Sequence, residues 1–332
     1  MKRQAFLKGG ILGLFALGLN SFKLEKSPSE KSSILPPPLK KGDSVALFAP
    51  AGAIFNSEHI SKLKNILNKQ GYKVVFAENL DYKNGYLAGS DKERLDAFHA
   101  LIKNKEVKAL IAVRGGWGCA RFIKNLDLNL IKANPKIIMG YSDLTSLLNY
   151  ITDKTGIITY HGPMAYSTWN NLALSEFNAR FVEQQKNVSL LKLDTDNYSN
   201  NKGSAQGILC GGNLTVLSHM LGTHYSLNVK NKILFLEETN EEPYVIDRML
   251  TQLRDSDYFK NVNGIVLGKF HKCVPEIKEK SISLLEVFDY HFKELDIPVF
   301  GFANFGHVKD KYILDIGRMA KINSANFRID LL

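Results

Sequence analysis

Hydrophobic and polar residues alternate in a repeated strand and helix pattern from Ser44 onward. The run VALFAP predicts a strand, the apolar spacing over residues 60–67 predicts an amphipathic helix, and KVVFAE predicts the next strand. Ser90 and Glu93 form a capping-box pattern before a further helix, and strands KALIAV and KIIMG follow. This order is typical of a parallel sheet covered by helices. We therefore predict a Rossmann-like, doubly wound α/β domain over residues 42–165.

The pattern weakens over residues 166–204, which are polar and rich in asparagine. We interpret this stretch as an interdomain connection with one helix around residues 174–185. Beyond it, the segments KILFLEE, NGIVLGKF and IPVFGFAN predict strands, and helices are expected over residues 244–254 and 284–295. We predict a second, smaller domain of mixed α/β or β-rich character over residues 205–332, with an active site at the interface between the two domains.

Residues 1–41 differ from the rest of the chain. Lys2 and Arg3 precede an apolar run over residues 9–19, which is too short to cross a bilayer, and a Ser-rich and then Pro-rich stretch follows. This order is typical of a signal-like leader and a stiff linker. We predict export, to the periplasm, with no stable membrane span in the mature protein. The alternative is a cytoplasmic protein with a terminal tail, and cell fractionation distinguishes the two.

The composition disfavours several classes of function. The net charge is +10, but the lysines are scattered, which favours a solvated surface over a nucleic-acid groove. Only Cys119, Cys210 and Cys273 are present, far apart and odd in number, so we expect buried thiols and no disulfide framework. The eight histidines include no HExxH pattern. We predict no metal and no cofactor.

Two glycine-containing turns follow predicted strands and carry candidate chemistry. In Gly-Tyr-Ser-Asp, Ser142 lies between a strand and a helix, as a nucleophile does in a strand-to-helix turn, although a serine there could equally cap the helix. In Arg-Gly-Gly-Trp-Gly, glycines allow the backbone to approach an anion, although an ordinary tight turn fits as well. We expect Arg114, Gly115 and Trp117 to contact substrate. The loop lacks a dinucleotide or Walker pattern.

Two further segments carry ionisable groups at strand ends. LEETNEEP, from residue 236, places four carboxylates in six positions, which suits a solvated loop, a metal site or one acid paired with a histidine. His307 follows the apolar strand IPVFGFAN, where a structural histidine is the ordinary alternative. Because side chains alternate along a strand, Glu237 and Glu238 should face opposite sides. We expect one to meet the cleft and the other to remain in water.

Together these segments resemble the LD-carboxypeptidase family (muramoyltetrapeptide carboxypeptidases) in order and spacing. The resemblance runs from about Ser44 to the end, through the blocks VALFAPAG, GYLAGSDKERLDAF, AVRGGWGCARF, IMGYSDLTSLL, YHGPM, GILCGGNL, ILFLEETNEEPYVIDRMLTQL, GIVLGKF and FGFANFGH. It implies that Ser142 is the nucleophile, Glu237 the triad acid and His307 the base. It also implies that the amides of Gly116 and Asp143 form the oxyanion hole.

The resemblance implies a serine carboxypeptidase that releases the terminal D-alanine of murein tetrapeptides through an acyl-enzyme. Its partner would be a small peptide or muropeptide, and a homodimer is left open. Two features depart from the family pattern: a tryptophan at position 117, where tyrosine is common, and the signal-like leader. A microcin C type immunity peptidase is the alternative enzyme, for which Trp169 would supply an aromatic platform. A non-catalytic muropeptide-binding protein is disfavoured because all three triad positions are filled.

Overall fold

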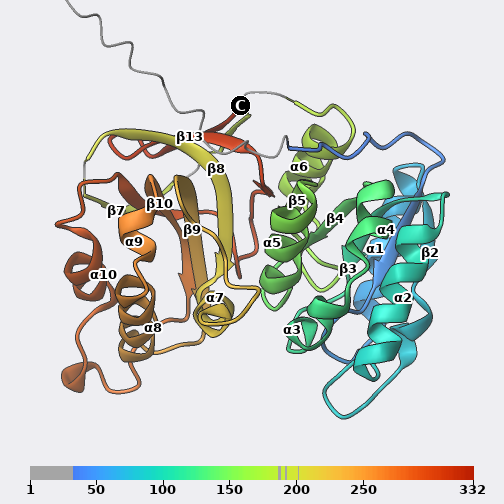
Figure 1. Cartoon of the computed structure of the whole chain (residues 1–332), viewed down its shortest axis with the longest axis horizontal. Helices are drawn as coiled ribbons and strands as arrows, with labels where there is room; N and C mark the ends of the chain where they lie inside the picture. The colour runs from blue at the N-terminus through green and yellow to red at the C-terminus, as the bar shows by residue number, and fades with distance from the viewer. Residues whose placement is uncertain (1–32, 186–187, 191–192, 201) are drawn as a thin grey trace, which may run out of the picture. The chain divides into compact units, whose positions relative to one another are not determined.

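Two β-sheets organise the chain in the computed structural model, which describes residues 33–332 apart from 186–187, 191–192 and 201 (Figure 1). Residues 33–332 form one compact unit. The predicted signal-like leader over residues 1–32 lies outside the described residues. Within the described ranges, no helix is both long and apolar enough to cross a membrane.

The first sheet has six strands in the order β12-β5-β4-β3-β1-β2, and β1 to β5 run parallel. Its strands are β1 (Ser44–Phe48), β2 (Lys73–Phe76), β3 (Val107–Ala112), β4 (Ile137–Gly140), β5 (Thr159–His161) and β12 (Leu314–Ile316). The helical segments along this part of the chain are α1 (Glu58–Lys69), η1 (Glu78–Asp81), α2 (Asp91–Lys103), α3 (Cys119–Phe122), η2 (Ile123–Asn125), α4 (Leu128–Ala133), α5 (Leu144–Thr155) and α6 (Asn171–Phe181). The parallel α/β architecture predicted for this region is confirmed.

The local signals explain where these elements begin and end. The Ser90 side chain accepts from the Glu93 amide while the Glu93 side chain accepts from the Ser90 amide, so the predicted capping box of α2 is confirmed. Helix α5 ends at Gly156, whose left-handed φ of 80° suits a residue without a Cβ. Strands β1, β3 and β4 are almost wholly buried, as expected for a sheet covered on both faces.

The second sheet has eight strands in the order β6-β14-β13-β8-β9-β10-β11-β7. Its central strands β8 to β11 are parallel, and antiparallel strands extend both sides. The strands are β6 (Val188–Leu190), β7 (Leu193–Ser199), β8 (Ser204–Asn213), β9 (Lys232–Thr239), β10 (Gly264–His271), β11 (Val299–Ala303), β13 (Met319–Asn323) and β14 (Arg328–Leu331). The helical segments are α7 (Leu214–Met220), α8 (Pro243–Asp255), α9 (Tyr258–Asn261), η3 (Lys278–Lys280) and α10 (Leu284–Phe292).

The division between the sheets does not follow the division of the sequence at residue 205. Strands β6 and β7 come from the stretch interpreted as a connection, and β7 pairs with β11. Strand β12, near the end of the chain, pairs antiparallel with β5 and completes the first sheet. Hydrophobic periodicity identifies strands but carries no information about which distant strand each will pair with, because pairing depends on tertiary packing.

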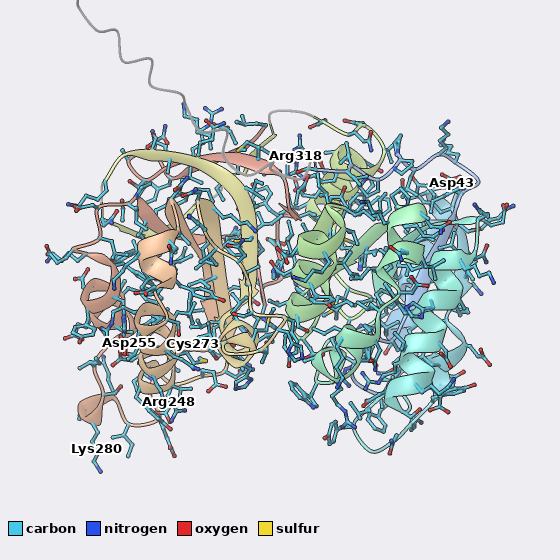
Figure 2. All side chains as sticks on the ribbon, viewed as in Figure 1. Asp43, Arg248, Asp255, Cys273, Lys280 and Arg318 are labelled. Atoms are coloured by element: carbon cyan, nitrogen blue, oxygen red, sulfur yellow. The ribbon has the colours of Figure 1, made fainter. Side chains whose placement is uncertain are left out.

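Buried ion pairs hold β12 in the first sheet. Asp315 lies on this strand, and Arg318 donates from Nη1 to its Oδ2 at 2.9 Å. Arg180 of α6 forms ion pairs with Asp315 at 3.4 Å and with Glu176 at 3.4 Å. All four side chains are buried. In Figure 2 Arg318 lies at the top of the view, between the parts of the molecule that hold the two sheets, whereas Arg248, Asp255 and Lys280 lie at the lower left, on the helical segments that follow β9 and β10.

Helix α5 joins the two sheets through buried hydrogen bonds. Asn149 donates to the Gly211 carbonyl at 2.8 Å and accepts from the Gly211 amide at 3.2 Å. Thr145 Oγ1 accepts from the Asn213 amide at 3.0 Å. A Cβ on Gly212 would lie 2.4 Å from Thr145 Oγ1, so only glycine allows this approach. The helix that follows Ser142 is therefore attached directly to strand β8 (Figure 1).

Candidate active site

The turn between β4 and α5 presents Ser142 with a φ of 64°, an uncommon value for a residue other than glycine. The helix N-cap is Asp143, and the Ser142 side chain caps no amide. The helix-cap interpretation of Ser142 is therefore wrong. Within the described residues the Ser142 hydroxyl has no hydrogen-bond partner, and non-glycine residues held at positive φ often occupy functional turns.

The Arg-Gly-Gly-Trp-Gly loop lies directly against this turn. A Cβ on Gly115 would lie 2.8 Å from Ser142 Cβ and 2.9 Å from Ser142 Oγ, so the close approach requires glycine. Gly116 has a φ of 112°. Among the described groups, neither the Gly116 amide nor the Asp143 amide donates a hydrogen bond to another part of the chain. Both donors are thus free for an anion beside Ser142, as an oxyanion hole requires.

The Asp143 carboxylate ties the loop to the nucleophile turn. It is buried and accepts from the Cys119 amide at 2.8 Å, at the start of α3. Burial raises the pKa of Asp143, and the hydrogen bonds from Cys119 and Gly118 oppose that rise. Cys119 is a free, buried thiol, as are Cys210 and Cys273, which confirms the expectation from the sequence.

Arg114 and Trp117 lie on either side of the glycine pair. The Arg114 guanidinium donates to the Ala53 carbonyl at 3.0 Å and packs 5.8 Å from the centre of the Tyr166 ring. Its position is therefore fixed by protein contacts. Trp117 is 42% exposed, so its ring is accessible to a ligand. Substrate contact by Arg114, Gly115 and Trp117 remains a prediction.

Glu237 and His307 form a hydrogen-bonded pair on the second sheet. His307 Nδ1 lies 2.7 Å from Glu237 Oε2, and the Glu237 side chain is fully buried. Burial alone would raise the pKa of Glu237, but the hydrogen bond and charge of His307, with the nearby His161, hold it below its usual value. A Cβ on Gly306 would lie 2.5 Å from Oε2, so glycine is needed before His307. A proton on Nδ1 leaves Nε2 to act as a base.

Glu238, on the opposite face of β9, does not remain in water as the sequence analysis expected. Its side chain is 2% exposed and accepts hydrogen bonds from Asn213 Nδ2 at 2.8 Å, from the Thr215 amide at 2.7 Å and from the Thr215 hydroxyl at 2.8 Å. Burial raises the pKa of Glu238, and these hydrogen bonds oppose the rise. The cause of the difference is helix α7, whose first turn covers this face of the strand and supplies the donors.

Tyr141, beside Ser142, brings the two sheets together at the site. The centre of the Tyr141 ring lies 4.8 Å from the centre of the His307 ring and 5.8 Å from that of the His161 ring. The Lys311 ammonium lies 4.3 Å from the centre of the same Tyr141 ring. Ser142 and His307 share no hydrogen bond in the described structure, although such bonds commonly tighten only when substrate is bound. Tyr141 therefore brings the turn that carries Ser142 into contact with the His307 ring.

Sequence reasoning assigned no role to His161 or Lys311. His161 is buried against Phe235 and Phe305, and among the described groups neither of its ring nitrogens has a hydrogen-bond partner. Burial is the main reason that the pKa of His161 falls to about 4, so this ring is neutral at ordinary pH. His161 lies within the block YHGPM of the family resemblance, but nothing in the sequence distinguished Lys311 from the other lysines.

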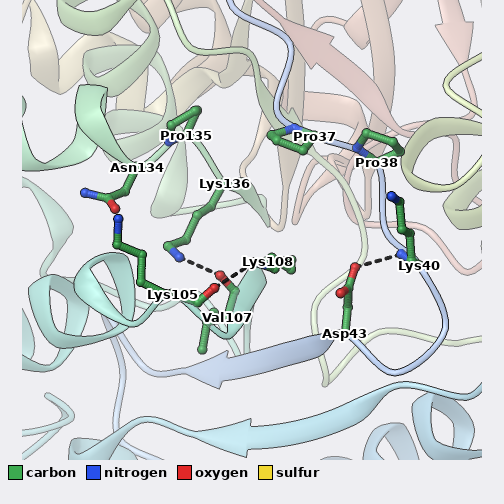
Figure 3. Close-up of a pocket in the computed structure, with 10 residues that line it drawn as sticks. All are labelled: Pro37, Pro38, Lys40, Asp43, Lys105, Val107, Lys108, Asn134, Pro135 and Lys136. Carbon is green, nitrogen blue, oxygen red and sulfur yellow. Dashed lines mark hydrogen bonds between the residues drawn. The ribbon is translucent and has the colours of Figure 1, made fainter.

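A pocket of about 390 Å³ lies at the end of the first sheet away from Ser142, where strands β1, β3 and β4 begin (Figure 3). Lys136 is buried there and donates to the carbonyls of Asn104 and Val107. Burial, with the charges of Lys108 and Lys105, lowers the pKa of Lys136 to about 8. Lys136 thus bonds to the start of β3, and the pocket is separated from Ser142 by the length of β4. The described part of the chain holds no group of three or more potential metal ligands.

Comparison with known proteins identifies the family of the chain. Residues 45–162 match the LD-carboxypeptidase N-terminal domain, and residues 206–322 match the LD-carboxypeptidase C-terminal domain. The chain belongs to the LD-carboxypeptidase family. It is 35% identical over 294 residues to the "Probable murein peptide carboxypeptidase" of Bacillus subtilis strain 168, which covers 87% of this chain and 92% of that protein. The family assignment expected from the sequence motifs is thereby confirmed.

Two solved structures share the whole architecture. The crystal structure of a muramoyltetrapeptide carboxypeptidase from Oxalobacter formigenes has a TM-score of 0.75 at 28% identity, covering 87% of this chain and 97% of that one. That of an MccF-like protein from Bacillus anthracis has a TM-score of 0.82 at 29% identity, covering 90% and 99%. The predicted α/β fold class is confirmed, and membership of the family makes this protein a hydrolase of the peptidase class.

Proposed function

We propose that this protein is a serine LD-carboxypeptidase that releases the terminal D-alanine of murein tetrapeptides. The observation that carries the proposal is the 2.7 Å contact between His307 Nδ1 and buried Glu237 Oε2, beside a serine hydroxyl without a partner in the described chain. The free amides of Gly116 and Asp143 support the same chemistry. The names of the Bacillus subtilis relative and the Oxalobacter formigenes structure support a murein peptide as substrate.

Acylation begins when His307 Nε2 removes the Ser142 hydroxyl proton. The serine oxygen bonds to the carbonyl carbon that precedes the terminal D-alanine, and the carbonyl electron pair moves to oxygen. The amides of Gly116 and Asp143 donate to this oxyanion. When the intermediate collapses, the carbon–nitrogen bond breaks and His307 gives its proton to the departing amine. D-alanine leaves, and the tripeptide remains as an ester on Ser142.

Deacylation repeats the same steps with water in place of serine. His307 removes a proton from water, the resulting oxygen bonds to the ester carbon, and the Ser142 oxygen leaves with the proton that His307 returns. The Glu237 carboxylate holds the imidazole with Nδ1 protonated and stabilises the imidazolium in both halves of the reaction. The ionised state of Glu237 is favoured by its lowered pKa.

Incubation of the purified protein with murein tetrapeptide tests the proposal. Mass spectrometry should detect tripeptide and free D-alanine in equal amounts, and a tetrapeptide ending in L-alanine should react far more slowly. The Ser142→Ala variant is the matched control for a contaminating peptidase. Absence of product with the wild-type protein, or equal turnover of the two terminal isomers, would contradict the proposed activity.

A microcin C type immunity peptidase is the second candidate, because the MccF-like protein shares the fold at 29% identity. Trp169, the residue expected to stack on the nucleotide base, gives this candidate little support. The Trp169 ring is half-buried, its Nε1 donates to the Met164 carbonyl at 2.9 Å and it packs against Phe177 of α6. An aminoacyl sulfamoyl adenosine offered beside murein tetrapeptide separates the candidates, and preferential cleavage of the nucleotide would favour the second.

A further inference from the structure

Lys311 is a buried cation four residues beyond His307, in the segment that leads to β12. The residue is 4% exposed, and its ammonium lies 4.3 Å from the centre of the Tyr141 ring. The same ring meets His307 edge-on at 4.8 Å between centres. Only one aromatic side chain therefore separates this ammonium from the expected base, and that side chain is the residue before Ser142.

No carboxylate of the described chain forms an ion pair or hydrogen bond with Lys311. The Glu237 carboxylate acts on the Lys311 ammonium through its charge, but this carboxylate is already hydrogen-bonded to His307. Burial lowers the pKa of Lys311 to about 8, and the charge of Glu237 opposes the fall. The Tyr141 face gives the ammonium an electrostatic contact but no counter-ion. A buried ammonium in this condition gains strongly from an incoming carboxylate, because a charge-assisted contact replaces the lost hydration.

The substrate of a carboxypeptidase carries such a carboxylate close to the bond that breaks. The carbon of the terminal carboxylate is two covalent bonds from the scissile nitrogen, or about 2.5 Å. A side chain that recognises it must therefore lie within a few ångströms of the serine and histidine. Arg114, the other cation considered for this site, already donates to the Ala53 carbonyl and packs on Tyr166. Lys311 lies over the Tyr141 ring, but within the part of the chain that the structure describes its ammonium donates no hydrogen bond.

We propose that Lys311 determines specificity by binding the α-carboxylate of the terminal D-residue. This inference rests on the proposed function of the site and adds the group that distinguishes a free peptide terminus from an internal peptide bond. Lys311 is thus a substrate-binding residue that enters from the second half of the chain, while the glycine loop and Ser142 enter from the first.

The test compares two substrates that differ only at the terminal group: murein tetrapeptide with a free carboxylate, and the same peptide as its C-terminal amide. The wild-type protein should prefer the free acid by about 10- to 100-fold in kcat/KM, as a single charged contact commonly does. In Lys311→Met, kcat/KM for the free-acid substrate should fall by that factor, while kcat/KM for the amide substrate should stay unchanged. The ratio of the two values should therefore approach one. Lys309→Met, which removes an exposed lysine two residues away, should keep the wild-type ratio.

Lys311→Arg extends the test by keeping the charge. It should retain part of the preference for the acid, and it replaces Lys311→Met if that variant does not fold. A third substrate, amidated on the side-chain carboxylate of its diamino acid, locates the contact. If Lys311→Met instead loses only its preference for this carboxylate, the terminal assignment is wrong.

Other outcomes overturn the inference in recognisable ways. An equal loss on acid and amide substrates would mean that Lys311 supports Tyr141 and His307 and does not bind the terminus. An unchanged ratio in Lys311→Met and in Lys311→Arg would remove any role in recognition. If the wild-type protein cleaves neither the acid nor the amide, the proposed function itself fails, and this inference fails with it.

Discussion

The first sheet presents Ser142 on a turn with a φ of 64° and without a hydrogen bond to the base, whereas the second sheet holds Glu237 and His307 already bonded at 2.7 Å. In the proposed mechanism the acid lies on β9 and the base on the loop after β11, whereas the nucleophile comes from the first sheet. We therefore expect the contact between the sheets to govern the proposed reaction, because the Tyr141 ring meets His307 and helix α5 is hydrogen-bonded to β8. Substitutions on either side of this contact should therefore have separable effects.

Ser142→Ala removes the contribution of the first sheet and should have the largest effect. We expect kcat/KM to fall by about 10⁴- to 10⁶-fold, since no other hydroxyl takes its place. The free energy of unfolding should change by less than about 0.5 kcal/mol, because the Ser142 side chain caps no amide. Steady-state kinetics and denaturant unfolding measure the two quantities, with the exposed Ser61→Ala as control. If Ser142→Ala keeps several per cent of the wild-type rate, the assignment of Ser142 as the nucleophile is wrong.

Glu237→Gln disrupts the pair on the second sheet. The amide cannot stabilise the imidazolium and favours the wrong arrangement of the imidazole proton, so kcat should fall by about 10²- to 10⁴-fold. The measurement is kcat at saturating substrate, with Glu241→Gln, on the loop after β9, as the control. A near-normal rate for Glu237→Gln would remove this residue from the triad.

Glu238→Gln sharpens the comparison between the two faces of β9. It should lower the free energy of unfolding by about 1–3 kcal/mol, because at least one buried donor from Asn213 or Thr215 loses its charged acceptor. Its loss in kcat should be far smaller than that of Glu237→Gln. Urea unfolding and steady-state kinetics on both variants check the ranking, and a reversed order of catalytic losses would show that the wrong face was assigned to the cleft.

The smallest expected effect is on pH dependence. Lys311 is protonated below its pKa of about 8, so KM for the free-acid substrate should rise as the pH increases through that value. The groups facing it do not titrate there: the pKa of His161 is about 4, that of Glu237 is below its usual value and that of Tyr141 is raised by burial. Lys311→Met should lack the rise. A parallel rise in KM in the variant would contradict the assignment.

Much of the first sheet could be predicted from the sequence because its signals are local. Apolar runs, helical spacing and the Ser90–Glu93 capping box each lie within a few residues. The three triad positions came from ordered motifs of the family, and the hydrogen bond between His307 and Glu237 agrees with them. The assignment of Ser142 to a nucleophile turn required the resemblance, since an isolated serine before a helix is equally suited to capping.

What could not be predicted depends on residues that are distant in sequence. The burial of Glu238 follows from donors on α7, more than twenty positions earlier, and alternation along β9 says only which face it occupies. The position of Lys311 beside Tyr141 depends on the return of the chain to the first sheet. Neither contact has a periodic or motif signal, because each arises from packing between elements.

The membership of β12 in the first sheet has a consequence for the order in which the protein can fold. During synthesis residues 44–161 emerge well before residues 314–316, so the edge of β5 stays unpaired until those residues have been made. Until then Arg180 lacks Asp315 as a partner, and an open strand edge is exposed to other chains. A ribosome-bound or truncated product that ends before residue 314 should therefore aggregate more readily than the chain of 332 residues.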